Sequence, residues 1–396
     1  MLYVSKVTNT LMKICTLIFT IFIASASIAA GIQTGAQNLD AYLPLVKDKK
    51  VALVVNHASV VNGEHLVDLL LAHKISPKMI FAPEHGFRGE ADAGEHLKNG
   101  VDAKSGLPIV SLYGSHKKPT PEDLKGIDTL LFDIQDVGVR FYTYLSTLHY
   151  VMEAAAENNL SVIVLDRPNP NGNRIDGPVL KKAYRSFVGL HPVPVLYGMT
   201  IGEYAMMING EGWLKDGVKA KLRVIPLLNY RHSDFYHLPV RPSPNLPNDL
   251  SIALYPSLAF FEGTVFSAGR GTVKQFQLYG APAYVKRDFS FLPQPSAGAK
   301  YPKHLGKRCY GVDLSGTALE KVRSAGIDLT YLLDAYQNCS DPEIFFLRNN
   351  FFDRLAGSDL LRKQIIEGKS ANEIRAVWQK ELKAFKAVRE KYLLYP

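Results

Sequence analysis

The sequence lacks the fingerprints of several common enzyme classes. It contains no G-x-G-x-x-G turn, and the residues that follow the first predicted strand are Asn56-His57-Ala58-Ser59, which excludes a dinucleotide site of the usual Rossmann type. No G-x-S-x-G occurs, which argues against a serine hydrolase of the α/β type. H-E-x-x-H is also missing, and the acids and histidines have no fixed ligand spacing, so a metal-dependent hydrolase is only an alternative.

Cysteine is scarce, with 3 residues in a chain of 396. Cys15 lies in the apolar leader, and Cys309 and Cys339 show neither a C-x-x-C nor a zinc spacing, so a structural zinc is not expected. In an oxidising compartment the latter two could pair, and two buried thiols are the alternative. The sequence also lacks a dense Lys/Arg tract with interleaved aromatics, so nucleic acid is not expected as a partner.

Long apolar runs are absent after residue 30, and residues 1–30 themselves are predicted to be an export signal. Lys6 and Lys13 supply positive charge, residues 14–24 are apolar, and cleavage after Ala26 or Ala29 fits the preference for small residues. An uncleaved anchor is the alternative, although the apolar segment is short for a membrane span. We therefore expect a periplasmic or extracellular protein with no stable membrane span after cleavage.

Residues 50–196 alternate short apolar runs with helical stretches. The runs are continuous rather than alternating, as is typical of parallel strands buried on both faces. They cover residues 51–55, 79–82, 109–110, 129–132, 161–165 and 193–196. Helices are predicted over residues 65–73 and 142–158. The pattern predicts the α/β class, with a Rossmann-like, doubly wound, mostly parallel sheet in a domain of residues 31–240.

The character of the chain changes after residue 200. Thr200 and Glu203 form a capping box that begins a helix, and Ser370 and Glu373 form another. Between them lie a Pro- and Asn-rich stretch and a Gly-rich aromatic stretch. This change predicts a smaller α+β auxiliary domain over residues 241–396 that contributes to the cleft.

Polar residues follow four of the predicted strands. In an open parallel sheet these strand ends meet at one edge, where ligands bind, so the sequence predicts a polar site there. Each residue also has an ordinary structural role, such as an ion pair between Asp166 and Arg167. The predicted set comprises His57, Glu84, His85, Arg88, Asp133, Gln135, Arg140, Asp166, Arg167 and Asn169.

This supply of carboxylates suits glycoside hydrolysis. That reaction needs a protonated carboxylic acid beside the leaving oxygen and a second group that stabilises or attacks the anomeric carbon. Glu84, Asp133 and Glu262 are candidates for these roles, and aromatic residues such as Tyr142 would contact the sugar. A non-catalytic sugar-binding protein is the alternative from another class.

Several long motifs resemble the exo-β-N-acetylmuramidase family (NamZ-like), formerly a domain of unknown function. They include FAPEHGFRGEADAGE, FDIQDVGVRFYTY, VLDRPNPNGNRIDGP, SPNLP and FEGTVFSAGRGT, and they span nearly the whole chain after the leader. The resemblance implies a Rossmann-like domain and an auxiliary domain with a cleft at their junction, and no organic cofactor. It also implies hydrolysis of the β-1,4 bond of a non-reducing terminal N-acetylmuramic acid in peptidoglycan fragments.

Residue by residue, the resemblance places the catalytic glutamate at Glu84. Relatives often carry an acid at the position of Ala268. Alanine at this position favours Glu262 as the second catalytic group. An arginine, either Arg88, Arg140 or Arg167, would bind the lactyl carboxylate in a bidentate manner. The second catalytic group, retention or inversion, and the oligomeric state stay open. The other matching positions carry over as cleft-lining candidates: His85, Asp133, Gln135, Asp166, Asn169, Glu262 and Arg270.

Overall fold

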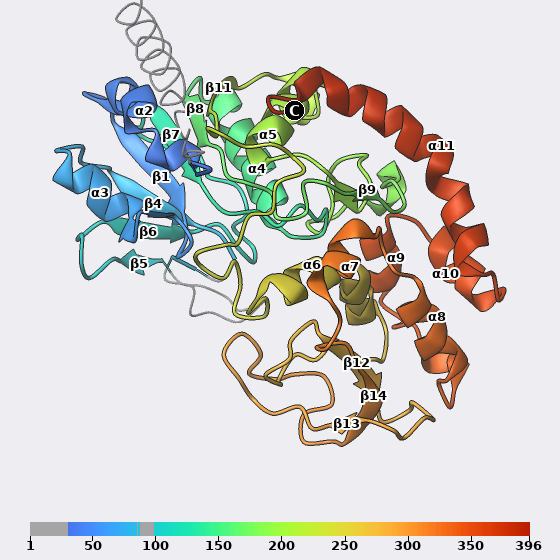
Figure 1. Ribbon diagram of the computed structural model, residues 1–396. Helices are drawn as coiled ribbons and strands as arrows, with labels where there is room; N and C mark the ends of the chain where they lie inside the picture. Colours follow the sequence, from blue (N-terminus) through green and yellow to red (C-terminus); the bar gives the residue numbers. More distant parts are fainter. Residues whose placement is uncertain (1–30, 85, 88–98) are drawn as a thin grey trace, which may run out of the picture. The chain divides into compact units, whose positions relative to one another are not determined.

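A seven-stranded sheet organises the first half of the chain in the computed structural model, which describes residues 31–84, 86–87 and 99–396. Neighbouring strands are parallel, except at one edge, where β5 pairs antiparallel to β6 (Figure 1). In spatial order the strands are β11 (Lys221–Ile225), β8 (Ser161–Leu165), β7 (Thr129–Asp133), β1 (Val51–Val55), β4 (Met79–Ala82), β6 (Pro108–Ser111) and β5 (Gly100–Val101).

The strand order is that of a doubly wound Rossmann-like sheet. From β1 the chain builds outward through β4 to β6, then returns to place β7, β8 and β11 on the other side of β1. The order therefore reverses between β1 and β7, where Val51 pairs with Thr129 and Val55 with Asp133. The predicted fold class is confirmed. Residues 33–396 form one compact unit.

Helices cover both faces of the sheet, which explains the continuous apolar runs. In Figure 1, α2 (Leu39–Val46) and α3 (Leu66–Ala72) lie on one face, and α4 (Tyr144–Glu157) and α5 (Ile201–Gly210) lie on the other. Within β1, Leu53 belongs to the core cluster that includes α2 and α3, whereas Val54 belongs to the cluster that includes α4 and α5. Successive side chains of the strand thus point into two different cores, so every position must be apolar.

Five of the six predicted strands lie in the sheet, and the sixth prediction was wrong. Residues 193–196 do not form a parallel strand; instead β10 (Leu196–Tyr197) pairs antiparallel with β9 (Ile175–Asp176) in a separate two-stranded sheet. The remaining parallel strand is β11, which sequence reasoning missed. In its sequence KLRVI, exposed positions alternate with half-buried ones up to the buried Ile225, because one face of this edge strand is open to solvent.

The predicted helices are confirmed as α3 and α4. Both capping boxes are also confirmed. Thr200 begins α5 by accepting from the amide of Glu203, whose carboxylate accepts from the amide of Thr200 at 2.9 Å. Ser370 and Glu373 repeat the arrangement at the start of α11 (Ala371–Arg389).

The rest of the chain combines a small antiparallel sheet with helices, as the α+β prediction states. The sheet order is β12 (Leu278–Ala281), β14 (Cys309–Asp313) and β13 (Ser290–Phe291). The domain boundary at residue 240 stays a prediction. Further elements include the pair β2 (Val60–Val61) and β3 (Glu64–His65), the helices α6 (Asp249–Leu258), α7 (Leu319–Ser324), α8 (Thr330–Gln337), α9 (Phe351–Ala356) and α10 (Leu360–Ile366), and the 3-10 helix η4 (Ala259–Gly263).

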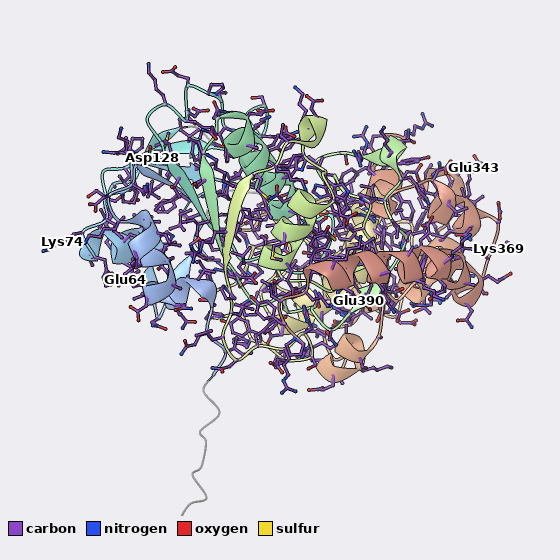
Figure 2. All side chains as sticks on the ribbon, turned by 90° about the horizontal axis from the view of Figure 1, so that it is seen from above. Glu64, Lys74, Asp128, Glu343, Lys369 and Glu390 are labelled. Carbon is purple, nitrogen blue, oxygen red and sulfur yellow. The ribbon has the colours of Figure 1, made fainter. Side chains whose placement is uncertain are left out.

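The surface and the interior separate as expected for a folded domain. Charged side chains such as Lys74, Asp128 and Lys369 are exposed at the periphery (Figure 2). Cys309 and Cys339 are buried free thiols and not a disulfide. Among the residues that the structure describes, no helix is both long and apolar enough to cross a membrane. The predicted signal of residues 1–30 lies outside the described residues.

Candidate active site

A pocket of about 1110 Å³ lies where the carboxyl end of β4, the start of α4 and loops of the C-terminal region meet. Among the described residues, two carboxylates line it, those of Glu84 and Glu262. Its walls are largely aromatic, and several cations also contribute. The cations are Lys117, Arg270, Lys300 and Lys303.

Glu84 is held against the first turn of a helix. It follows Pro83 directly after β4, in a turn that the amide of Gly86 closes by donating to the carbonyl of Pro83 at 3.0 Å. The hydroxyl of Thr143, the N-cap residue of α4, donates to Glu84 Oε2 at 2.5 Å instead of capping its own helix. This hydrogen bond holds the half-buried carboxyl group of Glu84 beside the N-terminus of α4.

Glu262 reaches the pocket from the opposite part of the sequence, within η4. Arg270 Nη1 donates to Glu262 Oε1 at 2.7 Å. The turn that carries Glu262 is held by Lys303, whose Nζ donates to the backbone carbonyls of Phe261 at 3.0 Å and of Phe266 at 2.9 Å, and also to that of Thr264. Burial lowers the pKa of Lys303 to about 8.

Tyr255 lies within electrostatic reach of both carboxylates. Its ring packs edge-to-face on those of Phe141, Tyr142 and Phe276, at centroid distances of 5.5, 6.1 and 4.9 Å. Burial, and then the negative charges of Glu262 and Glu84, raise the pKa of Tyr255 well above its usual value. Both carboxylates therefore lie within electrostatic reach of one phenol.

The structure brings only some of the predicted residues to this pocket. Glu84, Tyr142, Glu262 and Arg270 line it. His85 and Arg88 lie outside the described residues, and His57 lies at a separate pocket. The remaining six are buried and bonded inside the protein: Asp133, Gln135, Arg140, Asp166, Arg167 and Asn169.

Asp133 and Arg167 fill the point where the strand order reverses. Arg167 Nε and Nη2 donate to Asp133 Oδ1 and Oδ2 at 2.5 and 2.8 Å, and the two side chains are 3% and 0% exposed. Ser59 Oγ donates to the backbone carbonyl of Asp133. Gln135 Nε2 nearby donates to the backbone carbonyl of Pro168 at 2.8 Å. The crevice that binds cofactors in many Rossmann-like proteins is therefore occupied by the protein's own polar groups.

Arg140 and Asn169 also make internal contacts rather than facing the pocket. Arg140 donates to the backbone carbonyls of Pro178, Val193 and Leu355 at 2.7, 2.8 and 2.7 Å. Burial lowers the pKa of Arg140 to about 9. Asn169 Nδ2 donates to the carbonyl of Met199 at 2.8 Å. Arg140 and Arg167 are thus not placed to take the lactyl carboxylate that the sequence analysis assigned to an arginine.

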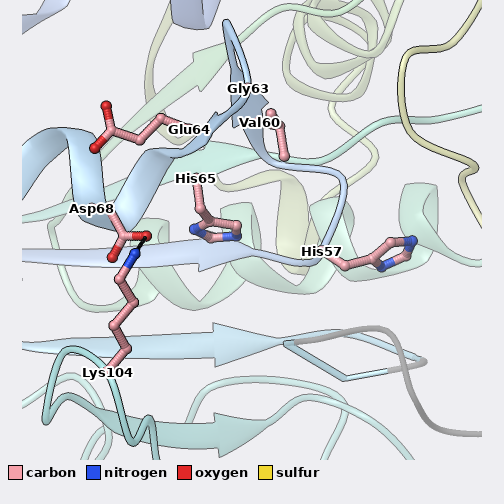
Figure 3. A pocket seen from close by; sticks show the side chains of 7 residues that line it. All are labelled: His57, Val60, Gly63, Glu64, His65, Asp68 and Lys104. Atoms are coloured by element: carbon pink, nitrogen blue, oxygen red, sulfur yellow. Dashed lines mark hydrogen bonds and ion pairs between the residues drawn. The ribbon is translucent and has the colours of Figure 1, made fainter.

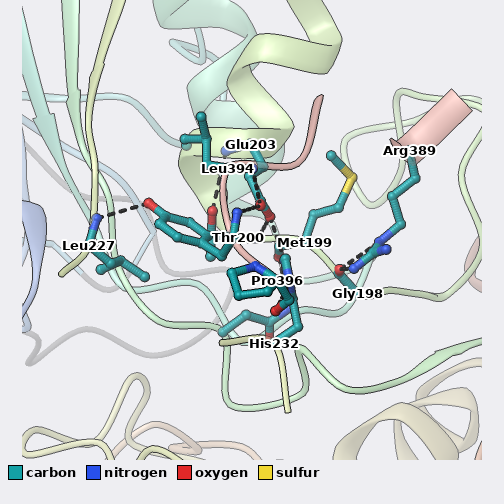
Figure 4. Close-up of polar contacts among 12 residues, drawn as sticks. Gly198, Met199, Thr200, Glu203, Leu227, His232, Arg389, Leu394 and Pro396 are labelled. Carbon is teal, nitrogen blue, oxygen red and sulfur yellow. Dashed lines mark hydrogen bonds and ion pairs between the residues drawn. The ribbon is translucent and has the colours of Figure 1, made fainter. Parts of the chain in front are cut away.

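Asp166 anchors the end of the chain. Its Oδ2 accepts from Thr200 Oγ1 at 2.7 Å and from Tyr395 Oη at 2.6 Å, and its Oδ1 accepts from the amide of Gly202 at 2.8 Å. Burial raises the pKa of Asp166 to about 7. Beside it, Glu203 accepts from the amide of Leu394 at 2.8 Å, which ties the last residues to the start of α5 (Figure 4).

A second pocket, of about 440 Å³, lies beside β3 and α3 (Figure 3). His57 lines it, and its Nε2 lies 2.9 Å from the carbonyl of Arg241. His65 Nε2 lies 2.9 Å from the carbonyl of Asn56, and Lys104 pairs with Asp68 at 2.6 Å. Within the described ranges, no three His, Cys, Asp or Glu side chains gather as a metal would require.

Sequence reasoning missed three residues that shape the main pocket: Thr143, Tyr255 and Lys303. Thr143 stands in the FYTY motif, so the motif itself was a signal. Tyr255 lies within an apolar helical stretch, where an aromatic residue usually indicates core. Lys303 is an ordinary basic residue in a loop, and nothing in its neighbourhood indicates burial.

Comparisons with known proteins identify the family. The family model described as "Exo-beta-N-acetylmuramidase NamZ, N-terminal" matches residues 51–250, and the corresponding C-terminal model matches residues 253–395. The peptidoglycan beta-N-acetylmuramidase NamZ of Bacillus subtilis (strain 168) is 41% identical over 384 residues, which cover 92% of this chain and 91% of that protein.

Two solved structures from Bacteroides fragilis NCTC 9343, both of DUF1343 family proteins, share the fold. One is 45% identical with a TM-score of 0.86, and the other is 31% identical with a TM-score of 0.77. In each case the match covers 92% of this chain and 99% of the other. The resemblance drawn from the motifs is confirmed: the chain belongs to the exo-β-N-acetylmuramidase NamZ family of glycosidases.

Proposed function

We propose that this protein hydrolyses β-1,4-linked peptidoglycan fragments and releases the N-acetylmuramic acid at their non-reducing end. The observation that carries the proposal is that Glu84 and Glu262 line one large pocket and both act on Tyr255. Most glycosidases use a pair of carboxylates at one site. The relative from Bacillus subtilis, named a peptidoglycan beta-N-acetylmuramidase, supports the choice of substrate.

Glu84 acts as the general acid in this proposal. It donates its proton to the glycosidic oxygen as the bond to the anomeric carbon breaks, and a water molecule then supplies the hydroxyl to that carbon and a proton to the protein. The hydrogen bond from Thr143 orients the Glu84 carboxyl group. Glu262 supplies negative charge that stabilises the positive charge developing on the sugar.

The lactyl carboxylate distinguishes muramic acid from glucosamine, and the pocket offers cations to bind it. In the described part of the lining, four cations stand against two carboxylates. Lys303 is occupied by backbone carbonyls and Arg270 pairs with Glu262. Lys117 lies 4.8 Å from the centroid of the Phe187 ring at the pocket wall, with its ammonium group over the ring face. We assign the recognition of the lactyl group to this cationic lining.

The test is to incubate residues 31–396 with N-acetylmuramyl-β-1,4-N-acetylglucosamine and follow both monosaccharides by mass spectrometry, with and without chelator. We expect release of both sugars, and a fall in kcat of about 10²–10⁴-fold for Glu84→Gln. Glu64→Gln, which changes a carboxylate of the smaller pocket, is the matched control and should keep full activity.

Three results would contradict this function. A near-normal rate for Glu84→Gln removes the assigned acid. Binding of the disaccharide without turnover by the wild-type protein makes it a sugar-binding protein. Activity that chelator abolishes and added metal restores indicates a metal-dependent hydrolase.

We also propose export to the periplasm or the extracellular space, on the basis of residues 1–30 alone. N-terminal sequencing of the protein from whole cells should begin at Ser27 or Ala30. An intact Met1 would show that the leader is retained.

A further inference from the structure

The buried phenol of Tyr255 has no hydrogen-bond partner among the residues that the structure describes. Tyr255 lies in α6, is 8% exposed and lines the pocket, yet no group in the described part of the chain bonds to its hydroxyl. Other buried phenols nearby are paired: Tyr142 donates to the carbonyl of Pro242 at 2.7 Å, and Tyr197 donates to Asp136. Buried tyrosine hydroxyls usually find a partner, so an unused one that faces a pocket points to a ligand.

The direction of this phenol is set before any ligand binds. Three rings contact that of Tyr255 edge-to-face, those of Phe141, Tyr142 and Phe276. Tyr142 is itself fixed by its bond to Pro242, and all three rings are at least nine-tenths buried. A donor held in this way costs little conformational entropy when it binds, which favours a role in specificity.

The charges around Tyr255 restrict what it can bind. The negative charge of Glu262 lies within electrostatic reach and disfavours an anionic acceptor at the hydroxyl, although Arg270, which pairs with Glu262, partly offsets that charge. Burial above all raises the pKa of Tyr255, so the hydroxyl stays protonated and can donate over the whole neutral range. These surroundings favour an uncharged oxygen as the acceptor.

We propose that Tyr255 is a specificity-determining residue whose hydroxyl donates a hydrogen bond to the carbonyl oxygen of the 2-acetamido group of the sugar bound between Glu84 and Glu262. The inference rests on the proposed function, because it takes the sugar to be N-acetylmuramic acid. Among the uncharged oxygens of that sugar, the amide carbonyl is a stronger acceptor than the hydroxyls or the ring oxygen. The lactyl carboxylate is left to the cations elsewhere in the lining.

The variant Tyr255→Phe tests this, because it removes only the hydroxyl and keeps the ring contacts. We expect kcat/KM for the disaccharide to fall about 10–100-fold, the usual effect of deleting one buried hydrogen bond to a ligand. Tyr331→Phe is the matched control, since that phenol is absent from the pocket lining, and it should leave kcat/KM unchanged. A melting curve checks that both variants are folded.

Calorimetry with two monosaccharides identifies the acceptor. The ligands are N-acetylmuramic acid and an analogue with a hydroxyl in place of the acetamido group. We expect the wild-type preference for N-acetylmuramic acid to shrink about tenfold or more in Tyr255→Phe, with affinity for the analogue unchanged. Equal losses for both ligands, or no loss in an active enzyme, would overturn the inference. A wild-type protein that neither cleaves the disaccharide nor binds the monosaccharide would instead remove the proposed function beneath it.

Discussion

Two pairs of carboxylates behave differently in this molecule, although the sequence analysis proposed all four as site residues. Asp133 and Asp166 end strands of the sheet and are fully buried, and every oxygen of their carboxylates accepts from the protein. Glu84 and Glu262 are half-buried and line a pocket. The difference shows that a strand-end carboxylate becomes a site residue only where the protein leaves space beside it.

The position of the pocket follows from the same difference. The reversal of strand order between β1 and β7 is closed by Asp133, Arg167 and Ser59. The pocket lies one strand away, at the carboxyl end of β4. Glu262 and aromatic residues from the chain after α6 form its opposite wall. The Rossmann-like sheet thus supplies one carboxylate, and the C-terminal region supplies the other.

Breaking the buried pair should cost the most stability. Asp133→Asn leaves the Arg167 charge buried without a counter-ion, and we expect the free energy of unfolding to fall by about 3–5 kcal/mol. Urea denaturation measures this. Asp68→Asn is the matched control, since its partner Lys104 is largely exposed, and it should cost less than about 1 kcal/mol. Equal effects of the two changes would refute the contrast between a fully buried ion pair and one with an exposed partner.

Changing the second pocket carboxylate should affect activity and not stability. Glu262→Gln keeps the shape of the side chain and removes its charge, so we expect kcat to fall about 10–100-fold with little change in melting temperature. Glu381→Gln, at an ion pair with Lys181 on the surface, is the control for loss of charge alone. A large fall in melting temperature with normal kcat would assign Glu262 to the structural group instead.

The smallest effect concerns the pH dependence of stability through Asp166. Burial raises its pKa from 3.8 to about 7, so the folded state holds a proton that the unfolded state has lost. This group therefore favours folding most below pH 4, and its contribution is lost as pH rises toward 7.

The variant Asp166→Asn removes this linkage. Between pH 5 and 7 its stability should fall less steeply than that of the wild type, by at most about 1.4 kcal/mol per pH unit. Denaturation at several pH values gives both slopes. Parallel curves would show that Asp166 is ionised in the folded protein.

The sequence by itself determined the fold class, most strands, the two capping boxes and the family. These features are carried by neighbouring residues: apolar runs of four or five residues form strands, and a capping box needs side chains only three positions apart. It also pointed to Glu84, which stands directly behind a strand. The edge strand β11 was not predicted, because its polar positions face solvent and interrupt the apolar run.

Only the tertiary structure decided which polar residues face the pocket. Arg140 bonds to a carbonyl 215 positions away, and Asp166 to a phenol 229 positions away. Tyr255 faces two carboxylates, one of which is Glu84, from a distant part of the chain. Whether a charge is buried, paired or open to a ligand depends on such distant contacts, because the cost of desolvating it is set by everything that surrounds it.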